Sequence, residues 1–119
     1  MTNFSAIDSM IRDSKGNVYV GRESGWVGSG QTYKITLNGK EIGVVGAGET
    51  VVGELVSGLN VIHASFYGIL DFDSGSDIYS FEASEESNKF LIVTTRTNGL
   101  VNSLRFMEVT ESSFEHAMR

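Results

Sequence analysis

The sequence predicts an all-β protein, a single antiparallel β-sandwich of about seven or eight strands with a short C-terminal helix. Short runs rich in Val, Ile, Tyr, Phe and Thr alternate apolar and polar side chains, as strands with one buried face do. The 14 glycines fall between these runs, where turns need positive φ angles, and no proline interrupts them. With 119 residues, 40% of them hydrophobic, the chain suits one domain with its own core.

The expected strands follow one another at a nearly regular spacing. Within residues 31–37, Tyr33, Ile35 and Leu37 share one face and polar side chains share the other. The Asn38-Gly39 pair that follows is the strongest two-residue hairpin signal, because both central positions of a type I′ turn need φ > 0. The strands are expected at residues 17–21, 31–37, 40–45, 50–56, 59–67, 77–83, 88–96 and 103–109.

The core is expected between two sheets, from the side chains that alternate inward along these strands. Residues 90–93 are apolar on both faces, which indicates a central strand. The predicted core residues are Val18, Val20, Tyr33, Ile35, Leu37, Val51, Leu55, Ile62, Ala64, Phe66, Leu91 and Val93.

The two ends of the chain differ in pattern. Residues 1–16 lack clear periodicity, and we interpret them as an N-terminal arm or short helix that precedes the sandwich domain at 17–119. Near the C-terminus, residues 111–118 fit a short helix with Ser112 as N-cap and Glu115 three residues on, which is the spacing of a capping box.

The glycine-rich stretch from Gly43 to Thr50 matches the phosphate-binding loop G-x-x-x-x-G-K-[ST] at all fixed positions but one. Glu49 stands where that loop has its lysine, and a carboxylate there would repel a phosphate. A phosphate loop also leads into a helix, whereas β-branched residues and glycine follow Thr50. We therefore interpret the stretch as a turn between two strands.

An acidic loop is the candidate metal site. Asp71, Asp73 and Asp77 echo the first, third and seventh positions of a calcium loop, and their carboxylates are the oxygen ligands that calcium prefers. Gly75 and Ser76 depart from that pattern at the fifth and sixth positions, and the flanks indicate strands rather than helices. The main interpretation is a solvated hairpin loop, and a calcium-stabilised module is the alternative.

The chain has two histidines, His63 and His116, and either could in principle be a catalytic base. A small hydrolase using His63 with a carboxylate is the enzymatic alternative, because such a base needs an orienting acid and a nucleophile within hydrogen-bond reach. No nucleophile-elbow motif accompanies it. We interpret His63 as a half-exposed strand residue and expect no enzymatic activity.

A loop after the first strand is the candidate contact surface. Trp26 lies among small residues at 25–30, and Arg22 precedes this loop. Binding residues concentrate on loops, and Trp and Arg are enriched among the residues that dominate protein interfaces. We therefore predict that Arg22 and Trp26 contribute to binding; for Trp26 the alternative, which we favour slightly, is a plug at one end of the sandwich.

Composition narrows the classes of function. Without cysteine, disulfides, thiolate metal sites and cysteine nucleophiles are excluded, and the net charge of −6 gives no basic footprint for nucleic acid. No stretch reaches the length of about 18 apolar residues that a membrane span needs. The N-terminus shows no signal-peptide pattern, so a cytoplasmic location is expected, or an envelope location if a leader has been trimmed away.

One set of residues, between residue 17 and about residue 95, follows a pattern of strands and turns seen elsewhere: Val18, Tyr19, Val20, Arg22, Ser24, Gly39, Lys40, Gly43, Gly58 and Ala64. In these residues the chain resembles an uncharacterised bacterial β-sandwich family, many of whose members are envelope lipoproteins, and its middle is similar to PEGA-type surface modules. The resemblance implies the sandwich fold and no catalytic residues. Two features depart from the family: Ser57 stands where a proline is usual, and there is no lipobox cysteine.

Together these patterns predict a non-enzymatic binding or interaction module without a cofactor. It would act through loops at one end of the sandwich or through an exposed strand edge. The expected partner is another protein or a second copy of the chain, and edge pairing would give a homodimer.

Overall fold

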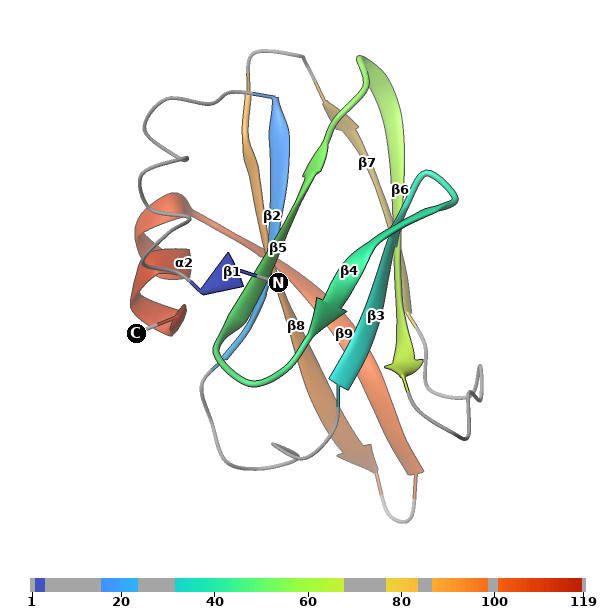
Figure 1. The fold of residues 1–119 in the computed structure, drawn as a ribbon, viewed down its shortest axis with the longest axis vertical. Coiled ribbons are helices and arrows are strands. Elements are labelled where there is room, and N and C mark those ends of the chain that lie inside the picture. The colour runs from blue at the N-terminus through green and yellow to red at the C-terminus, as the bar shows by residue number, and fades with distance from the viewer. Residues whose placement is uncertain are drawn as a thin grey trace.

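Two β-sheets lie face to face, and one short helix packs on the outer face of the larger sheet (Figure 1). The structure is a computed structural model that describes residues 2–3, 16–23, 32–67, 77–83, 87–98 and 101–118. The all-β sandwich with a short C-terminal helix, predicted from the sequence, is confirmed.

The five-stranded sheet has the order β1-β5-β2-β8-β9, and its strands are Thr2–Asn3, Glu49–Glu54, Asn17–Arg22, Lys89–Asn98 and Val101–Val109. The four-stranded sheet has the order β4-β3-β6-β7, and its strands are Lys40–Val45, Thr32–Leu37, Gly58–Tyr67 and Asp77–Ala83. Within the described ranges, every strand pair is antiparallel except β2 with β8. This parallel pair arises because the chain builds the whole four-stranded sheet, and β5, between these two strands.

The main core lies between the sheets. All twelve residues predicted for it belong to one cluster, in which Phe66 is partly buried and the other eleven are buried. In the central strand β8, Leu91 and Val93 face this core, while Phe90 and Ile92 face the other side of the sheet. The apolar character of both faces of β8 therefore reflects two packing layers.

The second layer is the helix α2, Glu111–Met118, on the outer face of the five-stranded sheet. Its Phe114 and Met118 pack against Tyr19, Phe90 and Ile92. Gly21 lets the helix come this close, because a Cβ built there would lie 2.5 Å from the Met118 sulfur and 2.9 Å from Cζ of Phe114. In the described part of the chain, no helix is long and apolar enough to span a membrane.

The N-cap residue predicted for the C-terminal helix was wrong. The N-cap of α2 is Thr110 and not Ser112: the backbone N–H of Ser113 donates to Oγ1 of Thr110 over 3.2 Å, and the N–H of Phe114 donates to the Thr110 carbonyl over 2.9 Å. Strand β9 ends at Val109, so the helix begins early enough to place Ser112 inside its first turn. Of residues 1–16, Thr2–Asn3 pair with β5 as β1, and residues 4–15 lie outside the described residues.

The glycine-rich stretch at 43–50 is a turn, as the sequence indicated. It comprises the end of β4, a turn in which Gly48 has φ of 75°, and the start of β5. The carboxylate of Glu49 accepts a hydrogen bond from the N–H of Gly46 over 2.7 Å. A strand follows instead of a helix, so this connection carries the chain from one sheet to the other and lacks the geometry of a phosphate loop.

Candidate functional site: a groove between β4 and β5

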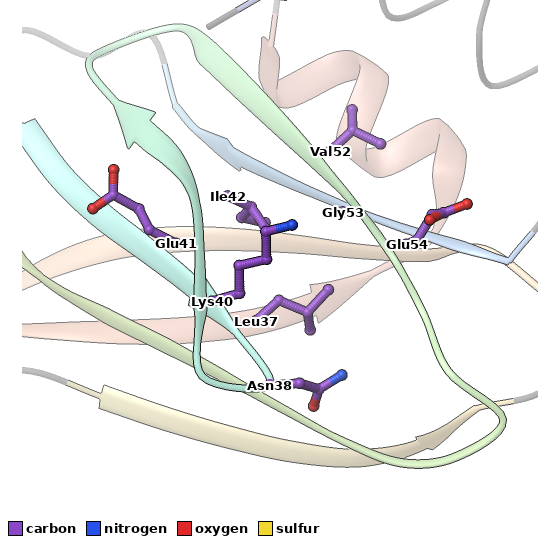
Figure 2. A pocket seen from close by; sticks show the side chains of 8 residues that line it. All are labelled: Leu37, Asn38, Lys40, Glu41, Ile42, Val52, Gly53 and Glu54. Carbon is purple, nitrogen blue, oxygen red and sulfur yellow. The ribbon is translucent and has the colours of Figure 1, made fainter.

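A groove with a volume of about 410 Å³ lies where the edge strand β4 of one sheet faces β5 of the other (Figure 2). It is open to solvent and combines an apolar floor with a polar rim. It is lined by Leu37, Asn38, Lys40, Glu41, Ile42, Val52, Gly53 and Glu54.

The floor of the groove depends on Gly53. A Cβ built on Gly53 would lie 2.8 Å from Cδ2 of Leu37 and 3.1 Å from Cδ1 of Ile42. Both distances are shorter than ordinary van der Waals contacts, so a larger residue in β5 would displace these side chains. A glycine inside a strand often marks such a close approach, and here it allows side chains of β3 and β4 to cover the backbone of β5.

The rim carries three exposed charged side chains, those of Lys40, Glu41 and Glu54. Figure 2 shows Lys40 and Ile42 on the side of β4 that faces β5, with the Lys40 chain extended toward Gly53. Among the described residues, none of the three charged groups forms an ion pair. The rim therefore presents charges of both signs that are available to a bound molecule.

The hairpin beside the groove is held by two asparagines. Asn38 and Gly39 have φ of 50° and 85°, which confirms the predicted hairpin turn. Side-chain Nδ2 of Asn38 donates to Oδ1 of Asn60 over 3.0 Å, and Oδ1 of Asn38 accepts from the N–H of Val61 over 2.8 Å.

Asn60 anchors this arrangement from inside the protein, since its side chain is fully buried. Its Oδ1 also accepts from the N–H of Val56 over 3.0 Å, and its Nδ2 donates to the carbonyls of Val56 and Gly58 over 2.8 and 3.2 Å. One amide thus ties the hairpin that forms one wall of the groove to the loop that follows β5. These hydrogen bonds hold the wall in place.

Strand β4 offers its backbone along the same side. Within the described residues, it pairs with β3 on one edge only. Leu37 and Lys40 close the two-residue hairpin as a hydrogen-bonded pair, so the next pair, Thr36 with Glu41, is of the non-hydrogen-bonded kind. The N–H and C=O of Glu41 therefore point away from β3 toward the free edge.

A β-bulge shapes this edge. The register shifts between Ile35 and Thr36, which pair with Gly43 and Glu41, so Ile42 has no direct partner in β3. Bulges and charged side chains are the devices by which natural proteins limit uncontrolled pairing at an edge strand. An edge with both devices favours selective pairing over general aggregation.

On the opposite side of the sandwich, side chains join the edges β7 and β9. Oδ2 of Asp77 accepts from the backbone N–H of Phe106 over 3.0 Å. The Tyr79 hydroxyl donates to one Glu108 oxygen over 2.7 Å, and Nζ of Lys89 donates to the other over 3.1 Å. We call the contacts of these five residues the β7/β9 seam.

Two pKa values in the seam respond to these contacts. The hydrogen bond from Tyr79 lowers the pKa of Glu108 below its ordinary value; Lys89 adds to this effect and partial burial opposes it. The same hydrogen bond raises the pKa of Tyr79, with burial and the negative charge of Glu108 acting in the same direction. The ionised Glu108 and the neutral Tyr79 are therefore the stabilised forms.

The predicted contact residue Arg22 lies inside the sandwich. Its side chain is only 5% exposed, and its guanidinium carbon lies 4.4 Å from the ring centroid of Tyr33 in the other sheet. This is cation–π geometry that joins the two sheets, and it leaves the Arg22 side chain little surface to offer a partner. Trp26 and the loop at 25–30 lie outside the described residues, so the structure does not place the predicted pair together.

Of the three predicted calcium ligands, Asp77 is placed by the structure, and Asp71 and Asp73 lie outside the described residues. The Asp77 carboxylate accepts the hydrogen bond from the Phe106 N–H of β9 in the seam. Within the described part of the chain, no three His, Asp or Glu side chains come together as metal ligands.

His63 lies on the outer face of the four-stranded sheet, half-buried as the sequence indicated. Its neighbours across the strands are Thr36 in β3 and Ile78 in β7. Among the described residues, no side chain forms a hydrogen bond or ion pair with it. The hydrolase alternative therefore finds no orienting carboxylate in this part of the protein.

No family model, curated protein or solved structure matches this chain. The family resemblance drawn from the sequence stays a prediction, and the site is assessed on its geometry alone.

Sequence reasoning missed the residues that build the groove. Gly53 did carry a signal, since an isolated glycine inside an apolar strand pattern suggests a close backbone approach. Asn60 also carried a signal, because it lies near the start of an apolar strand and a buried side-chain amide needs hydrogen-bond partners. Neither signal says which strand comes close, because that depends on how the two sheets are stacked.

Proposed function

We propose that this protein is a non-enzymatic interaction module that binds its partner along the β4/β5 side of the sandwich. The observation that carries the proposal is the coincidence, among the residues that the structure describes, of an apolar groove, rim charges without an ion pair and a strand edge without a partner on one side of the molecule. Each of the three is a feature by which proteins recognise partners.

The three features also act together. The Asn38–Asn60 network holds the groove wall in place, so little conformational entropy is lost there on binding. The groove offers apolar surface, the rim charges orient the partner, and the backbone of β4 supplies hydrogen bonds. The acid–base side chains at the groove, Lys40, Glu41 and Glu54, are exposed and form no ion pair among the described residues, so binding is the function that this geometry favours.

The test is affinity capture from the native lysate with matched charge variants. The groove variant combines Lys40→Glu with Glu54→Lys, which inverts the rim charge pattern at exposed positions. The control is Glu82→Lys, an exposed position on the outer face of the four-stranded sheet, opposite Leu59. We expect partners of the wild-type protein to be retained by the control and reduced at least 10-fold by the groove variant.

Two outcomes would contradict the proposal. Partners retained equally by both variants would place the binding surface elsewhere, and loss of all partners with both would indicate a non-specific charge effect. Light scattering on the same three proteins distinguishes self-association through the β4 edge, which we expect to weaken in the groove variant alone.

A further inference from the structure

We propose that the molecule bound on the β4/β5 side is an extended peptide segment that pairs with the free edge of β4, places an apolar side chain in the groove and carries a basic residue beside it. This inference rests on the proposed function and names the chemistry of the partner. It is argued from the backbone of β4, the size of the groove and the charge around it.

The backbone argument compares the outer strands of the two sheets. Strand β9 already has the N–H of Phe106 bound to Asp77, and β7 lies in the same seam. Strand β5 is partly covered, because Thr50 and Glu49 pair with β1. Strand β4 is six residues long, borders the groove, and turns the backbone groups of Glu41 away from β3, toward an edge without a partner strand among the described residues. Among the described strands it is therefore the best placed to accept another strand.

The groove fits side chains that project from such a strand. Alternate residues of a strand point to the same side and lie about 6.6–6.8 Å apart. A volume of about 410 Å³, open along β4, accommodates one or two apolar side chains of an added strand. Leu37 and Ile42 supply the apolar contact. A small molecule would need several polar groups that converge on it, whereas the charged groups here lie along the rim.

The charge argument selects a basic peptide. Lys40 faces the groove, while two carboxylates flank it: Glu54 at the end of β5, and Glu41 on the opposite side of β4. The whole chain has a net charge of −6, so its long-range field attracts positively charged segments and repels acidic ones. Lys40 does not oppose this choice, because its flexible stem lies over apolar surface and its ammonium group can move into solvent when the groove fills.

The experiment is selection of a phage-displayed random dodecapeptide library on the folded wild-type protein. We expect the selected peptides to alternate apolar with polar residues and to contain Lys or Arg next to an apolar position. A synthetic consensus peptide, measured by fluorescence anisotropy, should lose at least 10-fold in affinity for Glu54→Lys. It should retain its affinity for the Glu82→Lys control.

Backbone pairing is tested on the peptide itself. N-methylation removes one N–H at a time, and in an added strand only alternate N–H groups face β4. We expect affinity to fall at least 10-fold at alternate positions and to change less than 3-fold at the positions between them. Gly53→Val tests the groove by filling it, and a thermal melt verifies that this variant folds. If Gly53→Val unfolds, Glu54→Lys still provides the test, because Glu54 is exposed.

Three results would overturn the inference: no enrichment of peptides, enrichment of acidic or wholly polar sequences, or binding insensitive to both N-methylation and Glu54→Lys. Each is distinguishable from failure of the proposed function. Captured partners that depend on the rim charges, together with no peptide selection, would leave the interaction module standing and replace the peptide with a folded surface or a small ligand.

Discussion

The two long sides of the sandwich differ in how the edges of the two sheets meet. Along the β7/β9 side, Asp77, Tyr79 and Glu108 join one sheet to the other through hydrogen bonds. Along the β4/β5 side, the sheets are separated by a groove whose polar side chains lie at the rim. Both sides end in edge strands, which natural proteins must cover or protect.

The difference teaches where a partner can be accommodated. Asp77 already occupies a backbone donor of β9, so a molecule that paired there would first have to replace an intramolecular hydrogen bond. At β4 the backbone groups of Glu41 point to an edge without a partner strand among the described residues, and the bulge at Ile42 limits how a second strand can align. One side is closed by the protein's own side chains, and the other is rigid and open.

The largest expected effect comes from Asn60→Ala, which removes the anchor of the groove wall. The buried Asn60 amide makes four hydrogen bonds, so its loss removes the partners that it gives to the N–H and C=O of Val56 and to Nδ2 of Asn38. We expect the free energy of unfolding to fall by about 2–4 kcal/mol in chemical denaturation. Hydrogen exchange should accelerate at residues 36–41 and stay unchanged in β9.

The matched control is Asn38→Gly. Glycine keeps the positive φ of the turn and removes only the side-chain bonds to Asn60 and Val61, so a smaller loss of about 1 kcal/mol is expected. If Asn60→Ala lost less stability than Asn38→Gly, the groove wall would not depend on the buried amide, and the contrast between the two sides would lose its structural basis.

On the closed side, Asp77→Ala is expected to lower the free energy of unfolding by about 1–2 kcal/mol, because the Phe106 N–H loses an ionised acceptor. Hydrogen exchange should accelerate at residues 104–108. Asp77→Asn keeps an acceptor oxygen and should lose less than the alanine variant.

The same variants address the calcium alternative. If Asp77 acts only in the seam, the loss of stability in each of the two variants should be the same with millimolar calcium as without it. Wild-type stability that rises with calcium, and fails to rise in Asp77→Ala, would instead assign this carboxylate to a cation site with Asp71 and Asp73.

Local patterns were sufficient for the elements and the core. The period-two runs predicted the strands, Asn38-Gly39 predicted its turn, and the inward residues of each run predicted the central cluster. These features are encoded within short segments, since alternation decides which face is buried.

Features that depend on two distant segments were not predictable in this way. The parallel pairing of β2 with β8, the burial of Arg22 against Tyr33 and the use of Asp77 by β9 each depend on which strands become neighbours. The groove has the same origin, because Gly53 and Ile42 lie in different sheets. The sequence predicts Arg22 at the surface because charged side chains seldom lie inside, whereas its contact with the ring of Tyr33 helps to hold it between the sheets.

The smallest expected effect is the pH dependence of the seam. Glu108 has a pKa lowered from 4.5, so its contribution to stability is present above pH 4.5 and is lost as the pH falls below that value. Tyr79 has a pKa raised from 10.0, so its contribution is present below pH 10 and is lost as the pH rises above it. Glu108 is exposed and Tyr79 is only partly buried, so we expect a difference below about 1 kcal/mol.

The measurement is the free energy of unfolding of wild type minus that of Tyr79→Phe, as a function of pH. The difference should be constant between pH 5 and 9 and should decline below about pH 4.5 and above about pH 10. In a Glu108→Gln background the decline at low pH should disappear, because no carboxylate remains to be protonated. A difference that did not vary with pH in either background would show that the hydrogen bond between Tyr79 and Glu108 does not join β7 to β9 in solution. The contact between Asp77 and Phe106 would then be the remaining difference between the closed side and the open side.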